Sequence, residues 1–164
     1  DFMNTTALAL VSSLLILAAC SDSSTADGSA DGTGGATAGL SGPYAAGSVG
    51  ELATNVGDRV FFAYDSSVLT SEAQIILDRQ SEWLKGNTDV NIAIEGHADE
   101  RGTREYNIAL GERRASATKD YLVSQGVASS RVSTLSYGKE RPAVVGNDEG
   151  AWSQNRRSVT VLAQ

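Results

Sequence analysis

Apolar positions in the C-terminal part of the chain alternate between the spacing of strands and the spacing of helices. Residues 59–64 carry β-branched and aromatic side chains, and residues 90–95 alternate Val, Ile and Ile with polar or small side chains. Both patterns are typical of strands. Two further runs of this kind, at residues 131–137 and 158–162, predict a third and a fourth strand.

Two longer segments between these strands have helical spacing. From residue 71 onward apolar side chains recur at intervals of three or four, Thr70 or Ser71 can cap the segment, and Gly86 ends it. A second, longer helix is expected from about Arg104 to Gln125, closed by Gly126. The order of elements predicts an α/β fold, with a small four-stranded mixed sheet and two long helices packed on it.

The N-terminus has a different pattern, a short apolar run that ends in a cysteine. The run from Ala7 to Ala19 is shorter than the ~20 residues that cross a bilayer, but it suits the core of a signal peptide. Residues 17–20, Leu-Ala-Ala-Cys, resemble the lipobox of bacterial lipoproteins. We therefore expect a signal peptide over residues 1–19 and lipid on Cys20; a buried helix that happens to end in Cys is the alternative.

Residues 20–57 are expected to form the lipidated Cys and a flexible linker. They are rich in Gly, Ser and Asp and hold few large apolar side chains, so they cannot bury enough surface to offset the entropy of ordering. A chain of this length averages roughly 35 Å from end to end. The folded domain is expected over residues 58–164.

Charge and cysteine content exclude several classes of function. Acidic side chains outnumber basic ones by 20 to 13, and every Lys and Arg lies at or after Arg59. This balance argues against nucleic acid as a partner, because phosphate binding needs a clustered basic face. A single Cys cannot form an internal disulfide or a thiolate zinc site, and nothing in the sequence calls for a cofactor.

One arginine on the second predicted helix interrupts an apolar stripe. At 100° per residue, Arg114 falls about 40° from Leu110, on the same side as Asn107. The apolar residues of that stripe are Leu110, Ala117 and Tyr121. A guanidinium there must extend to solvent, pair with a structural carboxylate such as Asp99 or Glu95, or receive an anion.

The loop over residues 96–102 brings a carboxylate to the end of the second predicted strand. Asp99 in this loop and Arg114 on the helix could face one zwitterionic ligand, because a guanidinium takes a carboxylate bidentately and a carboxylate takes an ammonium. Asp65, at the end of the first strand, could add a third polar wall. His97 is expected to be a hydrogen-bonded loop residue rather than a ligand-binding one.

Five segments together resemble the OmpA-like family of peptidoglycan-binding domains, and most closely its lipoprotein branch, the peptidoglycan-associated lipoproteins. The run from Gly96 to Asn107 is the most specific of them, and the resemblance covers roughly residues 59–164. The segments read RVFFAYD at 59–65, EGHADERGTREYN at 95–107, LGERRA at 110–115, SYGKERP at 136–142 and NRR at 155–157.

The resemblance implies noncovalent binding of the peptidoglycan stem peptide through its diaminopimelate residue. Family members hold that zwitterion with the residues that match Asp99 and Arg114, and Asp65 matches a further polar position of the pocket. Asn107 is carried over as well, although its role could be to order the loop. Ser21, rather than Asp, follows the lipidated Cys20, and by resemblance to sorted bacterial lipoproteins this implies an outer-membrane protein with its domain in the periplasm. The family implies TolB and other Tol proteins as partners in envelope integrity and cell division.

Two other classes of function are compatible with the same residues. Glu95, His97 and Asp99 could act as metal ligands or as the acid and base of a wall hydrolase, although a single His gives no second motif with ligand spacing. In a protein-binding adaptor, Asp99 and Arg114 would form a structural salt bridge, and TolB would be the partner.

Overall fold

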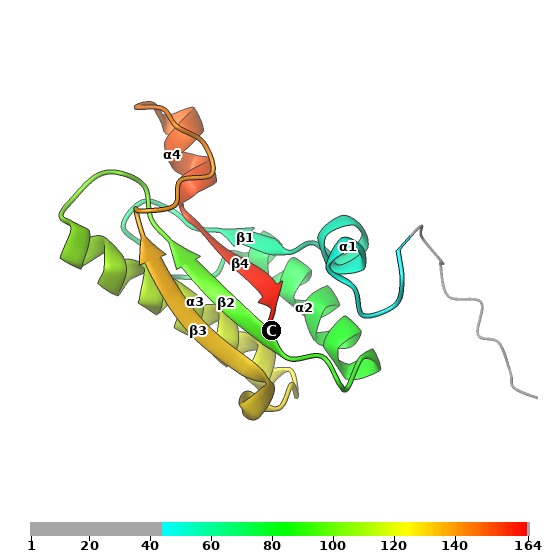
Figure 1. Cartoon of the computed structure of the whole chain (residues 1–164). Coiled ribbons are helices and arrows are strands. Elements are labelled where there is room, and N and C mark those ends of the chain that lie inside the picture. Colours follow the sequence, from blue (N-terminus) through cyan, green and yellow to red (C-terminus); the bar gives the residue numbers. More distant parts are fainter. Residues whose placement is uncertain (1–43, 164) are drawn as a thin grey trace, which may run out of the picture. The chain divides into compact units, whose positions relative to one another are not determined.

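The computed structural model describes residues 44–163. The expected signal peptide, Cys20 and the linker up to residue 43 lie outside this range. Within it, the chain forms a sheet with two long helices on one face and short helices at either end (Figure 1). None of the helices between residues 44 and 163 is long and apolar enough to cross a membrane.

The sheet has four strands in the order β1-β4-β2-β3. Strand β4 pairs antiparallel with β1 on one side and with β2 on the other, whereas β2 and β3 are parallel. This confirms the predicted mixed sheet. The strands are β1 (Arg59–Phe61), β2 (Ile92–His97), β3 (Val132–Gly138) and β4 (Arg157–Leu162).

The helices α2 (Ser71–Gly86) and α3 (Arg104–Ser124) both lie behind the sheet in Figure 1. Their ends follow the predicted signals. The Thr70 side chain caps α2 by accepting from the Ala73 amide, and Thr103 caps α3 in the same way. Past the end of α3, Gly126 takes a φ of 97°, which glycine adopts without steric cost.

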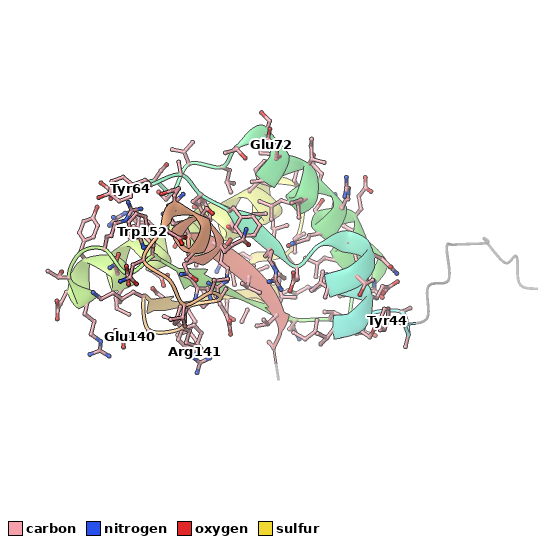
Figure 2. All side chains as sticks on the ribbon, turned by 90° about the horizontal axis from the view of Figure 1, so that it is seen from above. Tyr44, Tyr64, Glu72, Glu140, Arg141 and Trp152 are labelled. Atoms are coloured by element: carbon pink, nitrogen blue, oxygen red, sulfur yellow. The ribbon has the colours of Figure 1, made fainter. Side chains whose placement is uncertain are left out.

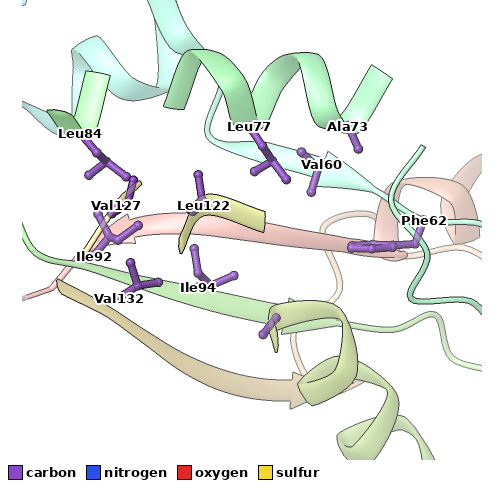
Figure 3. Packing of buried hydrophobic residues seen from close by; sticks show 11 residues of the cluster. Val60, Phe62, Ala73, Leu77, Leu84, Ile92, Ile94, Leu122, Val127 and Val132 are labelled. Carbon is purple, nitrogen blue, oxygen red and sulfur yellow. The ribbon is translucent and has the colours of Figure 1, made fainter. Parts of the chain in front are cut away.

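The core lies between the helices and the sheet (Figure 3). The face of α3 that packs into the core differs from the predicted stripe. Ala115 and Leu122 are buried, whereas Ala117 and Tyr121 are half-buried at the edge of the core. Arg114 is fully buried, so the alternative in which its guanidinium extends to solvent is wrong. The core cluster consists of Val60, Phe62, Ala73, Leu77, Leu84, Ile92, Ile94, Ala115, Leu122, Val127 and Val132.

Strand β2 begins and ends two residues later than the pattern of residues 90–95 predicts. The Arg131 side chain explains the late start, because its Nε and Nη2 atoms donate to the Val90 carbonyl at 2.9 and 2.7 Å. That carbonyl is therefore satisfied outside the ladder. The late end brings His97 into the strand, where it pairs with Gly138 after an irregularity in the register.

Four short helical segments are additional to the prediction. Helix α1 (Val49–Glu51) and the π-helix η1 (Leu52–Val56) lie within the expected linker, and Leu52 is buried. The packed chain therefore extends N-terminal to residue 58, where we expected the domain to begin. Helix α4 (Glu149–Asn155) precedes β4, and a 3₁₀ turn, η2 (Ser129–Arg131), precedes β3.

Candidate functional site

A pocket of about 190 Å³ opens where the loop after β1, the loop after β2 and the first turns of α3 meet. All four residues that the sequence assigns to ligand binding, Asp65, Asp99, Asn107 and Arg114, line it. The complete lining is Tyr64, Asp65, Asp99, Arg101, Gly102, Tyr106, Asn107, Leu110 and Arg114.

Arg114 is fully buried at the base of this pocket. Its Nε atom donates to the Ser66 carbonyl at 2.8 Å, Nη1 to that of His97 at 2.7 Å and Nη2 to that of Ala63 at 3.1 Å. These bonds fix the guanidinium but use three of its five N–H groups. Burial lowers the pKa of Arg114 to about 10, against the opposing effect of Asp99, so the side chain stays charged at neutral pH.

The Arg114 guanidinium has no carboxylate partner in the part of the chain that the structure describes. None of the ion pairs among residues 44–163 involves it. A buried charge is costly unless it is paired. The structural pair that the adaptor alternative requires, Asp99 with Arg114, is therefore not formed here, and the remaining N–H groups of Arg114 are suited to an anion from outside.

Asp99 is buried on the other side of the pocket and pairs with two different arginines. Arg101 donates to it from Nη2 at 2.6 Å and from Nε at 3.2 Å, and Arg156 donates from Nη1 at 3.5 Å. Burial alone would raise the pKa of Asp99, but the hydrogen bonds and charge of Arg101, with help from Arg156, lower it below its usual value. The carboxylate is therefore ionised at neutral pH.

Arg101 is a pocket residue to which the sequence analysis assigns no role. Its guanidinium lies between two aromatic rings, 4.1 Å from the centroid of Tyr64 and 4.0 Å from that of Trp152. Figure 2 shows these two rings on the same side of the molecule, far from Tyr44. Arg101 could have been predicted as a pocket residue, because it lies two residues after Asp99 in the same loop. Trp152 could not, because it lies on helix α4, which the sequence pattern does not predict.

Asp65 and Asn107 complete the polar lining. Asp65 has a φ of 50°, the sole positive value for a non-glycine residue between residues 44 and 163, and its carboxylate accepts a hydrogen bond from the Tyr106 hydroxyl. Such backbone conformations concentrate at functional sites. The Asn107 amide donates to the Arg101 carbonyl at 2.9 Å, so Asn107 fixes the loop as well as lining the pocket.

His97 lies beneath the pocket and does not line it. We expected a hydrogen-bonded loop residue, but it ends β2, is 1% exposed, and neither ring nitrogen has a hydrogen-bond partner among the described residues. Its Nε2 atom is 3.7 Å from Glu95, which is too far for a hydrogen bond. Burial, with repulsion from Arg157, lowers the pKa of His97 to about 4.

The residues of the hydrolase alternative therefore do not converge. Asp99 faces the pocket and is held by Arg101 and Arg156, whereas His97 is enclosed below it with Glu95 nearby. Residues 44–163 contain no cluster of three or more His, Cys, Asp or Glu side chains arranged to hold a metal ion. The neighbouring Arg113 is exposed, lies over the Tyr106 ring and does not itself line the pocket.

The profile of the OmpA family matches residues 61–156, the segment that builds this pocket. The chain belongs to the OmpA family. It is 51% identical over 162 residues to a peptidoglycan-associated lipoprotein of Mesorhizobium japonicum, across 98% of this chain and 92% of that protein. It is also 52% identical to the peptidoglycan-associated lipoprotein of Agrobacterium fabrum, across 90% of this chain and 82% of the relative.

Two solved structures of other proteins have the same fold. The crystal structure of the peptidoglycan-associated lipoprotein from Burkholderia pseudomallei aligns with a TM-score of 0.64 and 36% identity, over 68% of this chain and 99% of that one. The C-terminal domain of Helicobacter pylori MotB aligns with a TM-score of 0.61 over 65% of this chain and 84% of that one. At 19% identity, the second match supports the fold alone.

Proposed function

We propose that the chain is a wall receptor that binds the peptidoglycan stem peptide through its diaminopimelate residue, without turnover. The observation that carries the proposal is Arg114, a fully buried cation with no carboxylate partner in residues 44–163, which shares a pocket with the ionised Asp99. A zwitterionic amino-acid head group complements both charges. Asp65 and Asn107 then supply polar walls beside it.

Specificity would depend on one carboxylate. Diaminopimelate carries a carboxylate that lysine lacks, so a lysine-type peptide leaves the buried Arg114 without its anion. Leaving a buried charge unpaired costs several kcal/mol. The pocket is thus expected to reject lysine-type peptidoglycan even though the rest of the stem peptide is the same.

The resemblance extends this proposal to the whole protein. Lipid on Cys20 would anchor the chain in the outer membrane, and the domain on its linker would reach the wall in the periplasm. TolB and other Tol proteins would be its protein partners in envelope integrity and cell division. The names of the relatives, peptidoglycan-associated lipoproteins, support the first part of this picture.

The test is a calorimetric titration of the full chain with a diaminopimelate-containing muropeptide and with its lysine analogue. Asp99→Asn and Arg114→Gln should each weaken binding at least about thirtyfold, because each leaves one ligand charge without its counter-charge. Arg113→Gln is the matched control, since it removes the same charge from the adjacent, exposed position.

Circular dichroism and urea unfolding of each variant separate loss of ligand from loss of fold. Equal affinity for the two muropeptides, or no binding of either by the parent protein, would contradict the proposal. If Arg114→Gln does not fold, the comparison of the two muropeptides on the parent protein still decides between the outcomes.

A further inference from the structure

The Asp99 carboxylate has no vacant acceptor position in this structure. Two carboxylate oxygens offer about four lone-pair sites. On Oδ1 the donors are the Arg101 amide at 3.1 Å and Arg101 Nε at 3.2 Å, and on Oδ2 they are Arg101 Nη2 at 2.6 Å and Arg156 Nη1 at 3.5 Å. An ammonium that reaches Asp99 from the pocket must therefore displace one of these donors.

Arg156 is the less movable of the two arginines. Its side chain is 8% exposed, its Nε atom donates to the Phe62 carbonyl at 3.0 Å, and its Nη2 atom pairs with Glu149. Arg101 is 30% exposed, and its side chain makes hydrogen bonds to no residue other than Asp99 within residues 44–163. A displaced Arg101 head group can extend into water, where a guanidinium is well solvated.

The two aromatic rings set how firmly Arg101 holds its position. Each ring attracts the guanidinium through a cation–π contact. Trp152 is itself oriented, because its Nε1 atom donates to Glu100 Oε1 at 3.0 Å. Trp152 contacts the Arg101 guanidinium but is not among the residues that line the pocket.

We propose that Arg101 is an intramolecular competitor of the ligand, which occupies the ammonium position on Asp99 in the free protein and swings out when ligand binds. We call the position of Arg101 on Asp99 closed. Trp152 stabilises it through its contact with the Arg101 guanidinium and so raises the fraction of molecules in which it is occupied. The inference rests on the proposed function, since it assumes that Asp99 receives an ammonium. Apparent affinity is then the intrinsic affinity reduced by the fraction of molecules in which Arg101 is open.

The experiment is a titration of full-length variants with the diaminopimelate-containing muropeptide, with association rates measured by stopped flow. Arg101→Gln should bind about five- to tenfold more tightly than the parent and associate faster. Arg104→Gln is the matched control, because Arg104 lies on the same segment, pairs with Glu140 and does not line the pocket. It should leave affinity unchanged.

A double-mutant cycle tests the role assigned to Trp152. Trp152→Leu should raise affinity in the parent background, because it removes one of the rings that hold Arg101. In the Arg101→Gln background the same substitution should leave affinity unchanged, because Trp152 affects ligand binding only by holding Arg101. A merely structural tryptophan would give the same loss in both backgrounds.

The outcomes separate this inference from the proposed function. Tighter binding by Arg101→Gln supports the competitor, whereas weaker binding would show that Arg101 contacts the ligand, and unchanged binding would show that it does not occupy the ammonium position. Either of these last two results overturns the inference and leaves the wall receptor intact. Failure of the parent and of every variant to bind would instead overturn the proposed function, and the inference with it.

Discussion

Two arginines of this domain, Arg114 and Arg131, donate hydrogen bonds to backbone carbonyls, but they differ in burial. Arg131 is half-buried and donates to the carbonyls of Leu84, Asn87 and Val90 at the end of α2, where the helix dipole favours a cation. Arg114 is completely buried, has two N–H groups to spare and faces a cavity. Complete burial with residual donors beside a cavity, rather than the lack of a carboxylate alone, is what supports Arg114 as the proposed binding residue.

His97 makes the stability of the domain depend on pH. In the unfolded chain a histidine binds a proton near pH 6.5, whereas burial lowers the pKa of His97 in the folded domain to about 4. The unfolded state therefore binds more protons between these values, and the free energy of unfolding should fall by up to about 3 kcal/mol as the pH drops from 6.5 to 4. Urea unfolding across this range measures the effect.

His97→Gln should flatten this pH dependence between pH 6.5 and 5. Because His97 is the one histidine of the chain, its ring resonance reports its pKa directly by NMR. Glu95 and Arg157 lie near the ring, and the charge of Arg157 opposes its protonation. An unchanged slope in the His97→Gln variant would assign the dependence to other groups.

At the scale of elements, a contact between two glycines places α3 on the sheet. A Cβ atom on Gly96 of β2 would lie 1.8 Å from the Gly111 carbonyl oxygen of α3, so the two backbones touch without side chains between them. Gly96→Ala should lower the free energy of unfolding by about 2–3 kcal/mol. It should also weaken ligand binding, because Arg114 lies one turn beyond Gly111 on α3. Urea unfolding and the muropeptide titration measure the two effects.

Gly86→Ala is the matched control for this substitution. No atom lies within 4 Å of the position that its Cβ would take, and its φ is not positive. This variant should therefore keep both stability and affinity. Equal effects of the two substitutions would show that the close approach of β2 and α3 does not position Arg114.

The elements also show which parts of the fold a sequence pattern can predict. Helices α2 and α3 extend for 16 and 21 residues, so their periodicity, caps and terminal glycines were readable. Helix α4 has seven residues, includes Gly150 and makes barely two turns, which is too short for a periodic signal. Arg114 was predictable for the same reason, and Asp99 from its place just after a predicted strand. Tyr64 and Trp152, in contrast, meet Arg101 only through the tertiary fold.

At the scale of the whole domain, the segment over residues 44–57 packs near the start of β2, whereas the pocket lies beyond its end. A Cβ atom on Gly47 would contact Asn87 and Val90, just before β2, whereas Asp99 and Arg101 follow the strand. The chain toward Cys20 thus leaves the domain at the end remote from the pocket.

Residues 44–57 make contacts that are expected to stabilise the domain. Leu52 is buried, and the Glu51 carboxylate accepts from the Gly47 amide and from Trp83 Nε1, both at 2.7 Å. A chain that starts at residue 58 loses these contacts, and we expect it to be about 2–3 kcal/mol less stable than one that starts at residue 44. Its affinity for the muropeptide should be unchanged, because the pocket lies at the other end of β2. Urea unfolding and titration of the two chains measure both quantities. Equal stability would place residues 44–57 outside the cooperative domain, and a loss of affinity would show that the two ends of β2 are coupled.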